Sequence, residues 1–260
     1  MPVNYRGRWG GKVAIAAFVA SLIIFSPALL PSQATPPQSS LPAPAATPPQ
    51  NLPLLQVYPL PPQLERWQDS EQQGDYFDAI KPTAVGYLIW SSFPIKVYIE
   101  PPNDPADRRF QGWFKAVETA VTEWNQYLPL ERVAEREVAD IICLRSRPPL
   151  RATLNRQTRT FEFPTARNAE ASYKLYWRGN NPSTLVHRFT LEISPNQTDA
   201  FTLATARHEL GHALGIWGHS PDPADALYDT QVNNPPPISA RDINTLKKIY
   251  QQQTRLGGSL

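Results

Sequence analysis

Cysteine is almost absent from this chain: the 260 residues contain only Cys143, so no internal disulfide can form. We expect Cys143 to be a small buried side chain, because it lies in the apolar segment 139–144, which is typical of a strand. An excess of one charge is also lacking, since the formal net charge is +2 and no basic block is present. The composition therefore indicates no nucleic-acid partner.

Long apolar runs are scarce too, and the one that occurs lies near the N-terminus. Three basic residues precede the uncharged run 13–25, and residues 32–34 offer the small side chains that a signal peptidase reads. Two prolines at the end of the run favour a signal peptide, although the apolar stretch approaches the length of a membrane span. We predict that residues 1–34 are a signal peptide or an N-terminal membrane anchor. The rest of the chain would then be exported: secreted, periplasmic or membrane-anchored, with its folded domain outside the cytoplasm.

Proline, in contrast, is abundant after this segment. Residues 35–63 are rich in Pro, Ser, Gln and Ala, a composition that buries too little apolar surface to fold. We predict a disordered linker there, either featureless or a tether that holds the domain off a membrane. The folded domain is predicted to span residues 64–260.

Histidine is rare as well, and three of the four histidines lie in residues 206–220, A-R-H-E-L-G-H-A-L-G-I-W-G-H-S. His208 and His212 are four residues apart, so a helix places them on one face, where they can bind one metal ion. Glu209 projects toward the same ion from the next position. Gly215 suits a left-handed helix end, after which the chain can double back and bring in His219. Three protein ligands with an open fourth position are typical of a catalytic zinc site.

The pattern H-E-x-x-H-x-x-G-x-x-H resembles that of the metzincin metalloproteases, and Ser220 after the third histidine is similar to the matrixin branch, here in a bacterial-type form. The resemblance implies one catalytic Zn²⁺ held by His208, His212 and His219. It also implies that Glu209 takes a proton from a zinc-bound water and passes it to the leaving amine. The expected activity is that of a zinc-dependent endopeptidase acting on extended polypeptide, and we expect a monomer.

Methionine is missing after Met1, which is a departure from the family. Counted from His219, the position of the metzincin methionine turn falls on Leu227, followed by Tyr228, where matrixins also have a tyrosine. Leucine is apolar and similar in volume, so Leu227 can pack beneath the metal site, and we expect Tyr228 to be a packed aromatic. Matrixins commonly carry structural zinc and calcium ions, but this chain has only His187 and no aspartate between residues 141 and 197. We therefore expect no structural Zn²⁺ or Ca²⁺, and a surface or hydrogen-bonded core position for His187.

The resemblance implies an α+β, metzincin-like catalytic domain with a twisted mixed β-sheet, a backing helix, a zinc-binding active-site helix and a C-terminal helix. Residue patterns favour strands at 87–99, 138–144, 161–163, 173–177 and 186–193. A weakly supported helix falls within residues 64–82. The backing helix is predicted from an Asp104 cap to Leu128, the active-site helix from Thr198 or Asp199, and the last helix over residues 238–250.

Two other functions remain open at this point: a catalytically inactive zinc-binding domain, and an interaction domain tethered at the cell envelope. Leu227 in place of methionine favours the inactive domain. Glu209 argues against it, because a structural zinc site needs no free carboxylate beside the ion.

Overall fold

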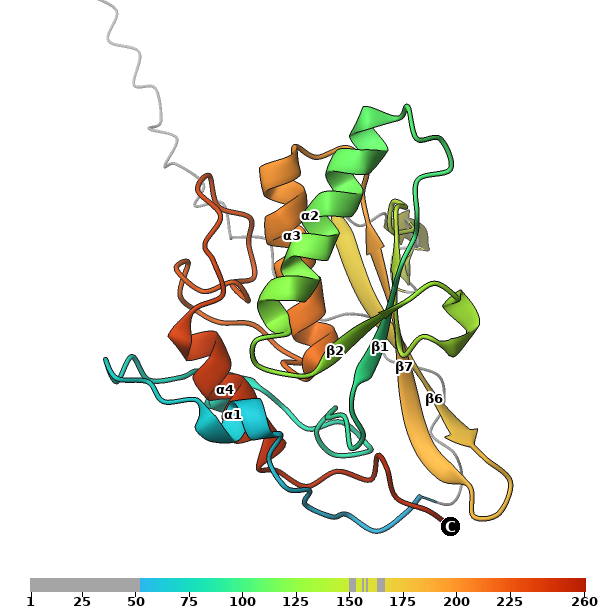
Figure 1. Cartoon of the computed structure of the whole chain (residues 1–260), viewed down its shortest axis with the longest axis vertical. Coiled ribbons are helices and arrows are strands. Elements are labelled where there is room, and N and C mark those ends of the chain that lie inside the picture. The colour runs from blue at the N-terminus through green and yellow to red at the C-terminus, as the bar shows by residue number, and fades with distance from the viewer. Residues whose placement is uncertain (1–51, 150–152, 156, 158, 163–166) are drawn as a thin grey trace, which may run out of the picture. The chain divides into compact units, whose positions relative to one another are not determined.

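The computed structural model describes residues 52–149, 153–155, 157, 159–162 and 167–260 (Figure 1). The predicted targeting segment 1–34 and most of the predicted linker lie outside these residues. The described part is mixed α and β structure, with a five-stranded, mostly parallel sheet and four α-helices, which is compatible with the α+β prediction. None of the helices in this part is both long and apolar enough to span a membrane.

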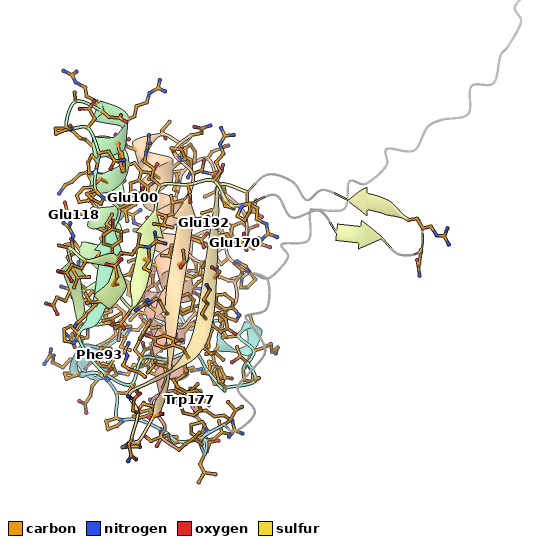
Figure 2. The ribbon with its side chains drawn as sticks, turned by 90° about the vertical axis from the view of Figure 1, so that its right-hand side faces the viewer. Phe93, Glu100, Glu118, Glu170, Trp177 and Glu192 are labelled. Atoms are coloured by element: carbon orange, nitrogen blue, oxygen red, sulfur yellow. The ribbon has the colours of Figure 1, made fainter. Side chains whose placement is uncertain are left out.

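The main sheet has the strand order β2-β1-β3-β7-β6. It contains β1 (Ile95–Ile99), β2 (Leu130–Val133), β3 (Ile141–Leu144), β6 (Ala169–Arg178) and β7 (Thr184–Ile193). Four of these strands run parallel, whereas β6 pairs antiparallel with β7 and lies at the edge. Figure 2 shows Glu170 of β6 beside Glu192 of β7 near one end of the sheet, in agreement with their direct pairing, and Trp177 toward the other end of β6.

The strand predicted at residues 161–163 is present at 161 and 162 but does not belong to the main sheet, and residue 163 lies outside the described residues. Residues 161 and 162 belong to β5 (Thr160–Glu162), which pairs antiparallel with β4 (Thr153–Asn155) in a separate two-stranded sheet. The two short strands follow each other closely in the chain, so local pairing needs little loop closure.

The backing helix, α2 (Arg108–Trp124), is shorter than predicted at both ends. Asp107, not Asp104, caps it by accepting a hydrogen bond from the Phe110 N–H at 3.0 Å, while Asp104 accepts from the Ala106 N–H in the preceding turn. After Trp124, the side chain of Asn125 accepts from the Leu130 N–H and turns the chain into β2. A local cap and a local turn therefore override the longer apolar pattern.

Helix α3 (Asp199–Leu214) packs beside α2 on the same face of the sheet (Figure 1). Its predicted cap is confirmed, since Thr198 Oγ1 accepts from the Phe201 N–H. The indole Nε1 of Trp124 donates to the Arg207 carbonyl at 2.9 Å and joins the two helices. Fully buried side chains fill the space between helices and sheet, among them Val97, Val117, Trp124, Ile141, Phe189, Ala206 and Leu210. Each large apolar side chain contributes about 1.5–3 kcal/mol by its burial.

Helix α4 (Ala240–Tyr250) begins two residues later than predicted, with a capping box between Ser239 and Asp242. The chain before β1 wraps over this helix (Figure 1). It contains only α1 (Pro62–Arg66) and the 3-10 turn η1 (Phe77–Ala79), so the helix expected within residues 64–82 is largely wrong.

The described chain before residue 64 belongs to the folded domain, so a linker that extends to residue 63 is wrong. Pro53 is buried, and Gln56 exchanges two backbone hydrogen bonds of 2.9 Å with Thr254 near the C-terminus. The backbone of this proline-rich stretch thus finds partners that are distant in sequence. We call residues 52–80 the N-terminal strap.

Candidate metal centre

Gly215 ends α3 and redirects the chain toward its third histidine. Its φ of +132° lies in the region that favours glycine, and the N–H groups of Gly215 and Ile216 donate to the His212 and Gly211 carbonyls. A Cβ at position 215 would also lie 3.1 Å from the Leu88 carbonyl oxygen. Glycine at this position allows the sharp turn that returns residues 216–219 to the end of the helix.

The structure brings His208, His212 and His219 together. One ring nitrogen from each lies within 4.8 Å of the other two, and the Nε2 atoms of His208 and His212 are 3.0 Å apart. The His219 ring centroid lies 5.2 Å from that of His208 and 4.9 Å from that of His212. In the part of the chain that the structure describes, this is the only group of three or more His, Cys, Asp or Glu side chains so arranged.

Backbone carbonyls fix the proton positions of two of these rings. His208 Nδ1 lies 2.9 Å from the Ala226 carbonyl oxygen, and His212 Nδ1 lies 2.7 Å from that of Ile216. A carbonyl only accepts, so each Nδ1 carries the hydrogen and each Nε2 presents a lone pair. Two lone pairs that face each other at 3.0 Å repel unless a cation lies between them. Two nitrogens about 2.0–2.1 Å from one tetrahedral ion would be roughly 3.3 Å apart, so these residues fit a metal ion.

The electrostatic setting keeps these imidazoles neutral, which is the form that binds metals. Burial lowers the pKa of His208 to about 4 and lowers that of His212 well below the usual value. The pKa of His219 is also lowered by burial, against an opposing effect from the Asp229 charge. All three side chains therefore have free lone pairs at neutral pH.

Glu209 directly follows His208 in α3 and is buried. Burial raises the pKa of its carboxyl to about 8, with a further contribution from the nearby charge of Glu170 and an opposing backbone hydrogen bond from Ala171. A cation bound by the histidines would act in the opposite direction and favour the carboxylate. Glu209 can therefore hold or release a proton near neutral pH, next to the edge strand β6.

Leu227 packs directly beneath α3. Its side chain is fully buried, and a Cβ added to Gly211 would lie 2.6 Å from Leu227 Cδ2. The Leu227 carbonyl accepts from the Ser220 N–H at 2.8 Å, and Tyr228 forms a parallel β-bridge with Ser220 while remaining half-buried. These contacts hold residues 220–228 as a floor against the helix that carries the triad.

The fourth histidine lies elsewhere in the core. His187 is 2% exposed and stacks on Trp90, with ring centroids 3.9 Å apart. The core position, one of the two expected, is therefore confirmed, but the Nε2 of His187 has no hydrogen-bond partner among the described residues.

The sequence did not identify the groups that orient the ligands: the Ala226 and Ile216 carbonyls, and Asp242. Asp242 could be recognised as part of a capping box with Ser239, but its carboxylate also accepts from the Ala226 N–H at 3.0 Å. No sequence signal indicates this second contact.

A scan against protein-family models finds no matching family, and a search of curated proteins finds no similar sequence. The likeness to matrixins therefore depends on the motif residues themselves. The geometry of the triad fits a metal ion.

Proposed function

We propose that this protein is an exported zinc-dependent endopeptidase with a metzincin-like fold of the matrixin type. The observation that carries the proposal is the convergence of three neutral histidine side chains, with the buried Glu209 directly after His208 in α3. The mixed sheet, with α2 and α3 on one face and an antiparallel edge strand next to Glu209, supports the fold assignment. The proposal includes export by residues 1–34, by cleavage or as a membrane anchor, and action as a monomer on polypeptide.

Each residue of the centre has a defined role in this proposal. His208, His212 and His219 hold the ion, and the Ala226 and Ile216 carbonyls orient the first two rings. Zinc at this position would supply a Lewis acid that polarises the scissile carbonyl and lowers the pKa of water. The Glu209 carboxylate accepts a proton from the attacking water as the new C–O bond forms. It then donates that proton to the amine nitrogen as the C–N bond breaks.

Strand β6 is the element that suits an extended substrate. It pairs with β7 on one side and has no partner on its other side among the described strands. An extended peptide can add to such an edge through backbone hydrogen bonds, largely independently of sequence. Because the carboxyl of Glu209 bonds the backbone of Ala171 in β6, a peptide along this edge would pass beside the metal centre.

A catalytically inactive zinc-binding or interaction domain is less well supported. The feature that favoured it was leucine at the methionine-turn position. Leu227 is buried and packed on Gly211, so its packing gives no reason to expect a disabled site. A purely structural zinc would also leave the buried Glu209 carboxyl without a role.

The test is hydrolysis of an unfolded, casein-type protein by the zinc-loaded full chain, with and without a chelator. Glu209→Gln should lower kcat at least about 100-fold, the typical contribution of a general base, and keep one zinc per chain. Glu192→Gln, which removes a carboxylate of β7 outside the motif, is the matched control and should retain activity. Full activity in Glu209→Gln would contradict the mechanism, and zinc-loaded protein without hydrolysis would favour the inactive domain.

A further inference from the structure

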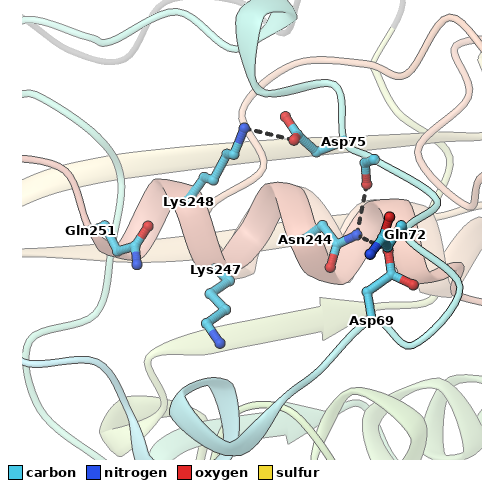
Figure 3. Close-up of a pocket in the computed structure, with 8 residues that line it drawn as sticks. Asp69, Gln72, Asp75, Asn244, Lys247, Lys248 and Gln251 are labelled. Carbon is cyan, nitrogen blue, oxygen red and sulfur yellow. Dashed lines mark hydrogen bonds and ion pairs between the residues drawn. The ribbon is translucent and has the colours of Figure 1, made fainter.

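The N-terminal strap is fastened to α4 by polar contacts that Figure 3 shows in part. Asn244 donates to Asp69 at 2.6 Å and to the Gly74 carbonyl at 2.7 Å, and Lys248 forms an ion pair of 2.7 Å with Asp75. Lys247 donates to the Trp67 carbonyl at 2.9 Å. Asp69, Asp75, Asn244, Lys247 and Lys248 line the pocket of Figure 3, and each already has a partner in the strap or in α4, so we regard the pocket as the seam between strap and helix.

One strap residue reaches deeper than this seam. Tyr76 is 5% exposed, and its hydroxyl donates to Asp242 Oδ1 at 2.6 Å. Asp242 is fully buried, and its other oxygen, Oδ2, accepts from the Ala226 N–H at 3.0 Å. The carbonyl of the same Ala226 residue accepts from His208 Nδ1 at 2.9 Å. Hydrogen bonds therefore connect the strap to a ring of the triad through the Asp242 carboxylate and the backbone of Ala226.

We propose that Tyr76 is a positioning residue for the metal centre, acting through Asp242 and Ala226 on the orientation of His208. The inference rests on metal binding by the triad, which is part of the proposed function. It makes the strap a structural component of the site, although the strap is far from the motif in sequence.

The physical reason lies in the partners of the Asp242 carboxylate. Oδ2 accepts from the backbone N–H groups of Ala226 and Ser239, whereas Oδ1 accepts from the Tyr76 hydroxyl. Without that hydroxyl, a buried carboxylate oxygen loses a strong hydrogen bond, and the carboxylate can rotate to share its remaining donors. Any rotation moves the peptide group that joins residues 225 and 226. Through the Cα atom of Ala226 it then moves the next peptide group, whose carbonyl orients the His208 ring. A ligand set tolerates only about 0.5 Å or 10–20° of such error.

The variant that isolates this effect is Tyr76→Phe. It removes one oxygen and keeps the buried ring, as well as the hydrogen bond from the Tyr76 backbone N–H to Thr245 Oγ1 at 3.0 Å. Tyr58→Phe is the matched control: Tyr58 belongs to the same strap, but its hydroxyl bonds Gln56 and Ser91 instead of α4. Asn244→Ala is a second control, because it loosens the strap at three contacts without touching Asp242.

Metal binding by the full chain should be measured with Zn²⁺ by competition against a chelator, and with Co²⁺ by its visible absorption. Tyr76→Phe should weaken Zn²⁺ affinity about tenfold, at the low end for loss of a ligand-orienting contact, and shift the Co²⁺ bands. Both controls should keep affinity and spectrum within twofold of the original chain, even where they lower stability.

Equal Zn²⁺ affinity and an unchanged Co²⁺ spectrum in Tyr76→Phe would overturn the inference. The same losses in Asn244→Ala would also overturn it, because they would mean that any loosening of the strap disturbs the site. Failure of the proposed function looks different. The unaltered chain would then bind no zinc, or would bind zinc without hydrolysing protein.

Discussion

The end of α3 and the aromatic cluster around His187 each contain a buried histidine, but the surroundings of the two imidazoles differ. His212 is 3% exposed and His187 is 2% exposed, and burial lowers the pKa of both imidazoles. Both are therefore neutral at neutral pH. Burial alone cannot explain why one belongs to a candidate metal centre and the other does not.

The difference lies in what surrounds the ring nitrogens. His212 has a carbonyl behind Nδ1 and the Nε2 atom of His208 in front of its own Nε2. His187 is stacked on Trp90 and packed edge-on against Phe189, and its Nε2 meets no partner among the described residues. An imidazole becomes a ligand where the backbone fixes its proton and other ligands converge on its lone pair.

The largest effect that tests this comparison is the loss of a triad histidine. His212→Ala should lower Zn²⁺ affinity by more than about 100-fold, beyond the usual effect of a contact that only orients a ligand, and should abolish hydrolysis. His187→Phe should bind Zn²⁺ as tightly as the original chain, because it keeps an aromatic ring in the stack with Trp90. Zinc content after dialysis and affinity by chelator competition measure both.

Similar losses of Zn²⁺ affinity in these two variants would contradict the comparison. Burial of the imidazole, rather than the orientation of its ring nitrogens, would then decide whether a histidine binds zinc. Thermal unfolding should accompany the measurement, so that a variant that fails to fold is distinguished from one that folds and binds no zinc.

A smaller effect concerns pH and His187. Burial lowers the pKa of this side chain to about 3, against about 6.5 when exposed, so the unfolded chain binds its proton more readily. The stabilisation by neutral His187 is fully present above pH 6.5 and is lost as pH falls from there toward 3. The difference in unfolding free energy between the original chain and His187→Phe should therefore change by about 1.4 kcal/mol per pH unit in that window.

Urea unfolding of both proteins at several pH values, under the same metal conditions, measures this difference. Above pH 7 the difference should be constant. A constant difference down to pH 4 would contradict the buried, uncharged state of His187.

The candidate site could be predicted from sequence more completely than its supports, and the reason is the distance along the chain. The i, i+4 spacing of His208 and His212 is local, so helix geometry predicts that the two share a face, and the glycine at 215 permits the turn that brings in His219. The contact from Tyr76 to Asp242 spans 166 residues, and no local pattern encodes it.

The fold shows the same limit. The sequence predicts a helix cap at Thr198 or Asp199, and the structure has Thr198, because capping is a local hydrogen bond. The hydrogen bonds between Gln56 and Thr254 are not predictable in this way, because the composition around Gln56 indicates a disordered linker. A proline-rich stretch has little tendency to fold by itself, but its backbone groups still form hydrogen bonds when another segment of the folded chain lies beside them.

The smallest expected effect comes from a substitution at Leu227, which packs beneath α3 but does not bind the ion. Leu227→Met should change the unfolding free energy by less than about 1.5 kcal/mol and leave Zn²⁺ affinity unchanged, because the two side chains have similar volumes and the Leu227 backbone contact to Ser220 is retained. Leu227→Ala is the control and should cost about 2–5 kcal/mol, since it opens a cavity against Gly211. Urea unfolding and chelator competition measure the two quantities.

A large gain in zinc affinity or hydrolysis in Leu227→Met would mean that leucine holds the triad imperfectly. The convergence of lone pairs would then depend on the floor as well as on the carbonyls behind the rings.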